Sequence, residues 1–276
     1  MAIVPNEPVL ALRGISKRFG AVQALTDVHL EVHAGEVVAL VGDNGAGKST
    51  LVKTIAGAGP ADGGVMEWCG RAVQVARPHD AQALGIATVY QDLALCDNLD
   101  VVANLFLGRE IRRAGVLDEV EMERRSRELL DTLSIRIPSV RIPVAALSGG
   151  QRQTVAIARS MLGEPRLVIL DEPTAALGVE QTAQVLDLVE RLRDRGMAVI
   201  LISHNMADVK AVADTVAVLR LGRNNGTFPV AATSQEEIIS AITGATDNAV
   251  TRRRARRDGA ADGGPSTRSD RAEAGQ

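Results

Sequence analysis

Aromatic residues are scarce in this chain of 276 residues, since phenylalanine, tyrosine and tryptophan together make up only 2% of it. Apolar residues nevertheless amount to 46%, so the hydrophobic core must be built from aliphatic side chains. The chain also lacks an excess of positive charge, because its formal net charge is −3. This excludes a nucleic-acid-binding protein whose affinity comes from an overall basic field.

Cysteines and long apolar runs are also few. Cys69 and Cys96 have neither the spacing of a metal site nor the number needed for a disulfide framework, so we expect buried free thiols in a reducing cytosol. No apolar run approaches the roughly 18 residues of a membrane-spanning helix. No apolar stretch follows a basic start, so we expect no signal peptide. A role at a membrane would therefore be exercised from the cytoplasmic side, through a partner.

The most informative stretch of the chain fits the Gly-x-x-x-x-Gly-Lys-Ser/Thr pattern of a phosphate-binding loop. It consists of Gly42, Asp43, Asn44, Gly45, Ala46, Gly47, Lys48, Ser49 and Thr50. An apolar run over 37–41 predicts a buried strand before it, and apolar residues at helical spacing over 51–55 predict a helix after it. In that setting the glycines let backbone N–H groups turn inward around a phosphate chain. Lys48 would contact the β- and γ-phosphates, and the Ser49 hydroxyl would bind Mg²⁺.

Two adjacent carboxylates follow the apolar run 167–170, which predicts another buried strand. Asp171 can hold Mg²⁺ through water, while Glu172 can polarise the water that attacks the γ-phosphate. A solvated acidic turn would explain the Asp-Glu-Pro sequence but not its place directly after an apolar strand. We therefore interpret these two carboxylates as catalytic.

Two other predicted strands also end in polar side chains. Gln91 follows the strand expected over 86–90, where its amide could reach a catalytic cleft or merely cap the strand. His204 follows the strand expected over 198–202, which should run parallel to the strand that carries Asp171. The imidazole could then point to the γ-phosphate, although an isolated histidine is more often structural.

A second anion site is indicated by a Ser-Gly-Gly turn that opens a helix. Its residues are Ser148, Gly149, Gly150 and Gln151, within the sequence Leu-Ser-Gly-Gly-Gln-Arg-Gln. The helix start directs backbone N–H groups and a positive dipole end at a ligand, as the first loop does. Two anion sites are consistent with one bound nucleotide if the second site faces the nucleotide of a partner chain.

Phe19 is one of only three phenylalanines. It lies between the strands expected over 9–12 and 24–32. Its ring could stack on adenine, which gives affinity with little base specificity. A place in the core or in a turn fits the periodicity equally well.

The remaining segments predict additions to this core. Residues 58–77 are glycine-rich with short β-like pieces, which predicts a small antiparallel extension. Apolar residues at helical spacing, a charged helix over about 118–133 and the lack of a clear strand signal predict an inserted helical subdomain over about 93–147. A capping box at 234–237 predicts one more helix.

The two ends of the chain differ from its middle in composition. Residues 1–8 form a short leader with two prolines, and residues 247–276 combine an arginine cluster with glycine, alanine, aspartate and serine. The second composition predicts a disordered tail. Its arginines could contact acidic lipid or nucleic acid, but a solvated tail is the simpler interpretation. One nucleotide-binding domain is expected over 9–246, since no internal repeat is found.

Together these motifs resemble those of the ATP-binding subunits of ABC transporters, across roughly residues 9–245. They occur in the order of that family: Walker A at 42–49, the Q-loop glutamine at Gln91, the signature at 147–151, Walker B at 167–171, the catalytic glutamate at Glu172 and the switch histidine at His204. The signature is the most specific of them, because other P-loop ATPases lack it.

The resemblance implies an α/β fold of the P-loop type. A mostly parallel core sheet would be flanked by helices and joined to an antiparallel β extension and an inserted helical subdomain. It also implies ATP and Mg²⁺ as cofactors, with Ser49, Gln91 and Asp171 directed to the metal. The signature of one subunit would contact the γ-phosphate bound by the other, which implies a head-to-tail homodimer with two shared sites.

Within the family, several segments are similar to the ATPases of bacterial monosaccharide importers of the ribose, xylose and fructose type. These segments are 42–45, 90–95, 106–110 and 172–178. The resemblance implies ATP hydrolysis at the cytoplasmic face of the cell membrane by a peripheral subunit. Its partners would be membrane permease subunits and, through them, an extracytoplasmic sugar-binding protein, with no nucleic acid. Gly178 stands where the family usually has an aspartate, so the coupling between the two sites is open.

A soluble ABC ATPase acting on ribosomes or DNA is the alternative, as is a transporter for another substrate. Family members that act on ribosomes usually carry two nucleotide domains, and those that act on DNA place a long coiled coil between Walker A and the signature. Here only 100 positions separate Lys48 from Ser148, and no heptad run fills them. An ATP-binding regulator without turnover is disfavoured by the presence of Glu172 and His204.

Overall fold

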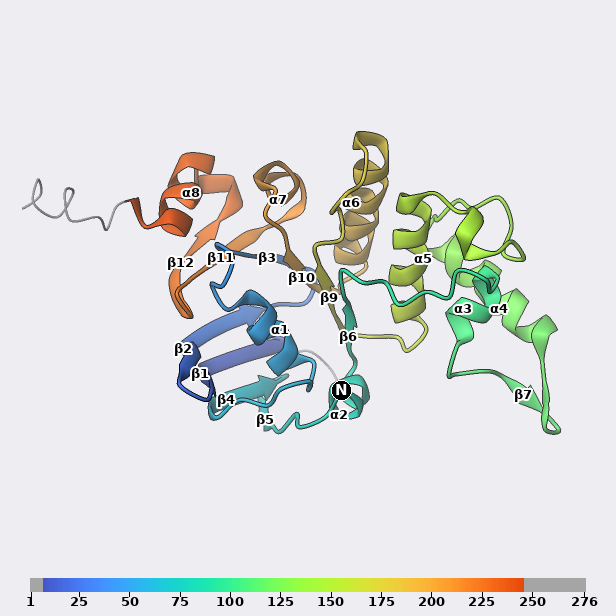
Figure 1. Cartoon of the computed structure of the whole chain (residues 1–276), viewed down its shortest axis with the longest axis horizontal. Helices are drawn as coiled ribbons and strands as arrows, with labels where there is room; N and C mark the ends of the chain where they lie inside the picture. Colours follow the sequence, from blue (N-terminus) through green and yellow to red (C-terminus); the bar gives the residue numbers. More distant parts are fainter. Residues whose placement is uncertain (1–6, 246–276) are drawn as a thin grey trace, which may run out of the picture.

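The computed structural model describes residues 7–245, and its centre is a six-stranded sheet in the order β12-β11-β3-β10-β9-β6 (Figure 1). The parallel strands are β3 (Val37–Val41), β6 (Ile86–Val89), β9 (Leu167–Asp171), β10 (Ala198–Ile202) and β11 (Thr215–Arg220). β12 (Arg223–Pro229) pairs antiparallel with β11 at one edge. Every residue of β3 and β10 is buried, as the uninterrupted aliphatic runs predict for strands covered on both faces.

Alternate residues of the central strands enter two different hydrophobic clusters. In β3, Val38 and Leu40 face the cluster that includes the second sheet, whereas Val37, Ala39 and Val41 face the cluster that includes the longer helices. β9 and β10 alternate in the same way. The core is therefore a layer of aliphatic side chains on each face of the sheet, almost without aromatic residues.

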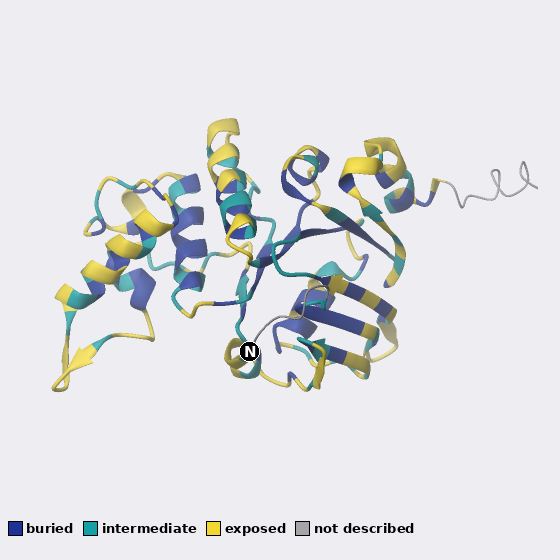
Figure 2. Ribbon diagram, turned by 180° about the vertical axis from the view of Figure 1, so that it is seen from behind, coloured by how far each residue is buried: buried dark blue, intermediate teal, exposed yellow. Residues whose placement is uncertain are grey.

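A second, antiparallel sheet covers one face of the centre in the order β2-β1-β4-β5. Its strands are β1 (Leu10–Phe19), β2 (Val22–Val32), β4 (Gly63–Trp68) and β5 (Arg71–Val73). Figure 2 shows buried and exposed residues alternating along this sheet, as expected for a sheet with one solvated face. The predicted antiparallel extension is present, and it is larger than residues 58–77 indicate because β1 and β2 belong to it.

Helices complete the two layers. On the side of the second sheet lies α1 (Lys48–Ile55), which shares the hydrophobic cluster of that sheet. The opposite face is covered by α5 (Gly149–Met161), α6 (Val179–Asp194), α7 (Met206–Val212) and α8 (Gln235–Thr243). A short helix, α2 (Pro78–Leu84), leads into β6. In residues 7–245 no helix is both long enough and apolar enough to cross a bilayer.

The helical subdomain predicted between the core strands is present. It contains α3 (Val101–Phe106), α4 (Glu119–Thr132) and the single turn η1 (Val144–Ala146). Asp118 caps α4 by accepting a hydrogen bond from the Glu121 amide, so the helix begins where its charge pattern predicts. Buried Asn104 fixes the loop before α3, since its side chain exchanges hydrogen bonds with the backbone of Cys96.

The expectation that this subdomain contains no strand is wrong at one point. β7 (Arg112–Arg113) and β8 (Val116–Leu117) form a hairpin across Ala114 and Gly115. Both turn residues have positive φ, 50° and 84°, as a tight two-residue hairpin turn requires. Strands of two residues are too short to show an alternating pattern. The predicted tail at 247–276 and all but two residues of the predicted leader at 1–8 lie outside the described residues.

Candidate functional site

The glycine-rich loop connects β3 to α1, where the sequence predicts it. Gly42, Gly45 and Gly47 have φ values of 152°, 79° and 106°. A Cβ at Gly42 would lie 2.2 Å from the carbonyl oxygen of Leu219, and one at Gly47 would lie 2.8 Å from Leu25. Both positions therefore need glycine for space as well as for conformation. No side chain caps α1 at Gly47, so its first N–H groups can bind an anion.

Lys48 folds back over this loop. Its Nζ donates to the carbonyl oxygens of Gly42 and Asp43, at 2.5 and 3.1 Å. These contacts hold the ammonium at the loop, and no carboxylate of residues 7–245 pairs with it. Ser49 is exposed and Thr50 is half-buried in the first turn of the helix. The loop thus presents a cation, a hydroxyl and a helix start together, which is the chemistry that a polyphosphate requires.

The ends of β9 and β10 bring Asp171, Glu172 and His204 together. The register pairs Ile202 with Asp171, and the Glu172 amide donates to the Ile202 carbonyl oxygen at 3.0 Å. Glu172 Oε2 lies 2.5 Å from His204 Nδ1. Glu172 has a φ of 52°, which is uncommon for a residue other than glycine and is concentrated at functional sites.

The surroundings of Asp171 disfavour the ionised form of its carboxyl group. Burial raises the pKa of the Asp171 carboxyl above its usual range, and the adjacent Glu172 carboxylate raises it further, while Lys48 and Lys53 act in the opposite direction. Burial also raises the pKa of Tyr90, and Asp171 adds to that shift, so the residue before Gln91 faces the same edge of the sheet. A divalent cation at this edge would relieve the electrostatic cost of the two carboxylates.

Asp171→Asn is expected to raise the free energy of unfolding of the metal-free protein at neutral pH. A carboxyl whose folded-state pKa is raised favours folding in its protonated form, and this advantage is lost as the pH rises through that pKa. The gain from the substitution should therefore be present at neutral pH and disappear as the pH falls below the usual aspartate range. Urea unfolding at several pH values measures it, and a gain that does not depend on pH would contradict the assignment.

Gln91 and Phe19 lie on different elements, one in the loop after β6 and the other at the end of β1. Gln91 is exposed in the loop after β6, whose Val89 pairs with Leu170 next to Asp171. Phe19 ends β1 with its side chain 54% exposed, so it lies in a strand and not in the core or in a turn. Lys17 Nζ lies 5.5 Å from the centroid of the Phe19 ring, and the exposed part of this ring can stack on a base.

The Ser-Gly-Gly turn caps its own helix. The Gln151 amide donates to Ser148 Oγ at 3.2 Å, and the Ser148 amide donates to Gln151 Oε1 at 3.0 Å. The helix start is thus partly satisfied within its own chain, because the motif is also a capping box. The Ser148 hydroxyl hydrogen and the amides of Gly149 and Gly150 are not used in that capping box and could bind an anion.

The two glycines of this turn also have a packing role that their motif does not reveal. A Cβ at Gly150 would lie 2.9 Å from Gln181 Cβ, and one at Gly149 would lie 3.1 Å from Leu177. They let the start of α5 approach the start of α6.

The two predicted anion sites lie at different places in the chain's fold. α1 and α5 lie on either side of β9 and β6 (Figure 1), so Lys48 at the start of α1 and Ser148 at the start of α5 are on opposite sides of these two strands.

A hydrogen-bonded group that the motifs did not predict joins the loop that carries Glu172 to the loop that carries His204. Thr174 Oγ1 donates to Asp208 Oδ2 at 2.6 Å, and Asn205 Nδ2 donates to Asp208 Oδ1 at 2.9 Å. Asp208 is only 5% exposed, and both of its oxygens have a partner. It therefore connects the loop that carries Glu172 with the loop that carries His204. Its only sequence signal is an acidic residue in the first turn of a short helix.

Asp208→Ala is expected to lower kcat for ATP while KM changes little, because it releases the loops that carry Glu172 and His204 and leaves the glycine-rich loop 42–50 intact. Removing a buried carboxylate that accepts two hydrogen bonds should also cost ~1–3 kcal/mol of unfolding free energy. Glu236→Gln is the matched control, since Glu236 lies exposed in the first turn of α8. Thr174→Val should have a smaller effect in the same direction, and the double variant should be less than additive. Full additivity would show that the two residues act independently.

Comparison with known proteins identifies a family and several relatives that this chain resembles. A family described as ABC transporter matches residues 25–175. The chain is 44% identical over 235 residues to a xylose/arabinose import ATP-binding protein of Sulfolobus acidocaldarius, covering 85% of this chain and 94% of that one. It is 42% identical over 250 residues to a fructose import ATP-binding protein of Rhizobium meliloti, covering 88% and 96%. A solved ATP-binding cassette of an ABC transporter in its ADP conformation superposes with a TM-score of 0.74 at 25% identity, covering 86% of this chain and 95% of that one.

Proposed function

Because the chain belongs to the ABC transporter family, we propose that it is the ATP-hydrolysing subunit that energises import of a simple sugar. It would act as a peripheral protein at the cytoplasmic face of the cell membrane, through separate permease subunits. An extracytoplasmic sugar-binding protein would deliver the sugar to them. The observation that carries the enzymatic part is the meeting of Asp171, Glu172 and His204 at the sheet edge near Lys48. The names of two relatives that match this chain over nearly their whole length support a sugar as substrate.

ATP and Mg²⁺ fit the groups that this region presents. The glycine cradle and the uncapped start of α1 suit a polyphosphate, with the residues of the loop 42–50 around it and Phe19 against the adenine. The oxygens of Ser49, Gln91 and Asp171 are hard ligands of the kind that Mg²⁺ prefers. When bound, the metal neutralises charge on the phosphate oxygens and orients them for displacement.

In catalysis, Glu172, His204 and Lys48 have different roles. Glu172 holds the attacking water and accepts its proton, and His204 Nδ1 fixes the orientation of that carboxylate through the 2.5 Å contact. Lys48 stabilises the charge that develops on the transferred phosphoryl group, since its ammonium is already held over the loop. Gln91, which follows β6 at the same edge, would report the state of the site to the helical subdomain.

A second copy of the chain would complete each site. Ser148, Gly149, Gly150 and Gln151 of one copy would face the γ-phosphate held by the Lys48 loop of the other. The supporting observations are the Ser148 hydroxyl and two glycine amides that the capping box does not use, and the positions of α1 and α5 on either side of β9 and β6 (Figure 1). The head-to-tail arrangement has two equivalent sites. Position 178 is a glycine, so no carboxylate at this position connects the two sites.

The proposal is tested in the source organism by deleting the gene and measuring uptake of labelled ribose, xylose, arabinose and fructose. Uptake of at least one sugar should be lost, and it should return with the wild-type chain but not with Glu172→Gln. In parallel, the purified chain should release phosphate from ATP. Unchanged uptake of every sugar would contradict the transport assignment, and a purified chain without ATPase activity would contradict the enzymatic one.

A further inference from the structure

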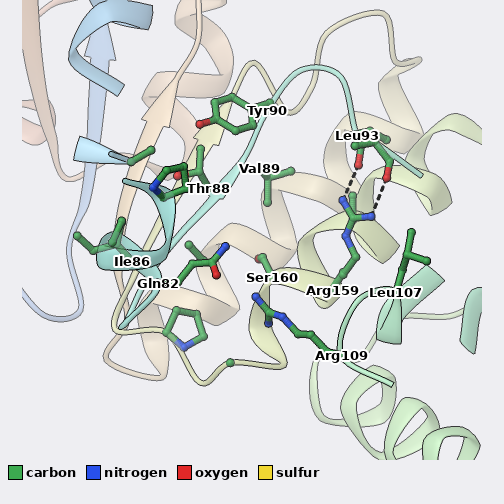
Figure 3. Close-up of a pocket in the computed structure, with 18 of the residues that line it drawn as sticks. Gln82, Ile86, Thr88, Val89, Tyr90, Leu93, Leu107, Arg109, Arg159 and Ser160 are labelled. Atoms are coloured by element: carbon green, nitrogen blue, oxygen red, sulfur yellow. Dashed lines mark hydrogen bonds between the residues drawn. The ribbon is translucent and has the colours of Figure 1, made fainter. Parts of the chain in front are cut away.

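The loops around the site are held in place by elements outside them. The loop that follows β6 is held by a side chain: Arg159 of α5 donates to the carbonyl oxygens of Leu93 and Ala94, both at 2.7 Å, beside a cavity of about 290 Å³ (Figure 3). The glycine-rich loop 42–50 is held differently, by the backbone of the turn that joins β11 to β12. This turn consists of Leu221 and Gly222, and it belongs to none of the sequence motifs.

The turn lies between the glycine-rich loop and β2, and it bonds to both. The Gly222 amide donates to the carbonyl oxygen of Ala46 at 3.0 Å, and the Gly222 carbonyl oxygen accepts from the Thr26 amide at 2.7 Å. β2 in turn pairs with β1 through Val22 and Phe19. One residue thus connects the loop that is proposed to bind the phosphates with the strand that pairs with Phe19.

The bond to Ala46 fixes the direction of one peptide group in the glycine-rich loop. In a planar trans peptide the carbonyl oxygen and the following N–H point in opposite directions. Because the Ala46 oxygen points to the turn, the Gly47 N–H points away from the turn. No group of residues 7–245 accepts a hydrogen bond from this N–H, so it is available to an anion at the start of α1.

Close packing also fixes the position of the turn. A Cβ at Gly222 would lie 2.5 Å from the carbonyl oxygen of Ala24 and 3.4 Å from the Cα of Leu25. Leu221 and Gly222 have φ values of 49° and 75°, the two positive values of a two-residue hairpin turn. A positive φ is uncommon for leucine, and the Leu221 side chain is 78% exposed. The turn is therefore held by its backbone contacts and not by packing of the Leu221 side chain.

We propose that Gly222 is a positioning residue for the nucleotide. Its backbone keeps the Gly47 N–H directed to the phosphates, and it sets the distance between the glycine-rich loop and the strand that pairs with Phe19. The inference rests on the proposed function, since it requires that the loop binds ATP. The N–H groups of the loop contact the phosphates both before and during the reaction. Misalignment of these groups should therefore weaken ATP binding without slowing turnover at saturation.

Gly222→Ala is expected to raise KM for ATP about tenfold, the cost of one lost hydrogen bond to a charged group, while kcat stays within about twofold of wild type. The added Cβ would meet backbone atoms of Ala24, so the turn and its N–H must shift. Gly196→Ala is the matched control, because Gly196 has a similar φ of 81° but open space at its Cβ, in the turn between α6 and β10. Both variants bear the same conformational cost, so the difference between them measures the contact with Ala24.

Calorimetry with tripolyphosphate, which has no base, separates the loop from the adenine site. Gly222→Ala should lose about the same factor of affinity for tripolyphosphate as for ATP, and Gly196→Ala should bind both like the wild type. A wild-type KM in Gly222→Ala, or an equal rise of KM in the two alanine variants, would overturn the inference alone. So would a loss of affinity for ATP that tripolyphosphate does not share. A wild-type chain that binds no ATP would overturn the proposed function.

Hydrogen exchange of single amides in the wild type decides the matter if Gly222→Ala does not fold, as judged by thermal unfolding. Without nucleotide, the Gly222 amide should exchange slowly and the Gly47 amide quickly, because only the first has an acceptor in residues 7–245. ATP with Mg²⁺ should slow exchange at Gly47. A Gly222 amide that exchanges quickly, or a Gly47 amide that ATP does not protect, would overturn the inference.

Discussion

Glu172→Gln is expected to reduce steady-state ATP hydrolysis by ~10²- to 10⁴-fold, the usual contribution of a general base, while ATP affinity stays within a few-fold of wild type. The amide has the size and position of the carboxylate, so it can keep the contact with His204, but it cannot accept a proton from water. Phosphate release measures turnover, and calorimetry measures binding. Because hydrolysis is blocked while binding persists, an ATP-bound dimer should accumulate in sedimentation experiments.

The control for this prediction is Glu236→Gln, which changes an exposed glutamate on α8 in the same chemical way. It should hydrolyse ATP like the wild type. Turnover of the Glu172 variant at the wild-type rate would show that another group activates the water. A parallel loss of ATP affinity would instead indicate that Glu172 acts in binding.

Lys48→Ala is expected to weaken ATP binding by ~10- to 100-fold, as for loss of one or two charge-assisted hydrogen bonds, and to abolish measurable turnover. Among residues 7–245 the Lys48 side chain bonds only to the carbonyl oxygens of Gly42 and Asp43, and it takes no part in either hydrophobic cluster. Thermal unfolding without nucleotide should therefore stay close to wild type. Calorimetry with ATP and Mg²⁺ measures the loss.

Lys53→Ala is the matched control, because Lys53 is exposed on the same helix and also lowers the pKa of Asp171. If general electrostatics explained the effect of Lys48, the two variants would behave alike. Lys53→Ala is instead expected to bind ATP with wild-type affinity. Equal ATP affinity of Lys48→Ala and the wild type would contradict a role of Lys48 at the phosphates.

The central strands could be predicted from the sequence because strands that are buried on both faces have a simple sequence pattern. β3, β9 and β10 are covered on both faces, so each is an uninterrupted aliphatic run. The strands of the second sheet were predicted too short, since β1 continues past Leu12 through register shifts and exposed polar residues. These residues lie on a solvated face, where polar side chains carry little information about strand length.

The candidate site could likewise be predicted only in part from the sequence. The positions of its motifs follow from local pattern, and the structure brings Asp171, Glu172 and His204 to one edge as the parallel strands predict. The Thr174–Asp208 hydrogen bond and the packing of Gly150 on Gln181 depend on loops and helices that are distant in sequence. No spacing rule encodes such contacts.

Crosslinking between two chains tests whether each ATP site is shared between them. Two chains with one cysteine each are mixed, one carrying Asn44→Cys and the other Ser148→Cys, so that only an intermolecular pair can form. Both positions are exposed, whereas Gly45 has a positive φ and a Cβ at Gly149 would crowd Leu177. Cys69 and Cys96 are replaced by serine in both chains, which also carry Glu172→Gln to retain ATP.

We expect ATP with Mg²⁺ to strongly increase crosslinking by a short thiol-reactive linker between positions 44 and 148. Arg113→Cys paired with Asn44→Cys is the control, because position 113 lies on the β7–β8 hairpin of the helical subdomain, away from the signature turn. That pair should not respond to the nucleotide. A mixture of the Asn44 and Ser148 variants that crosslinks no better with ATP than without it would contradict the shared site.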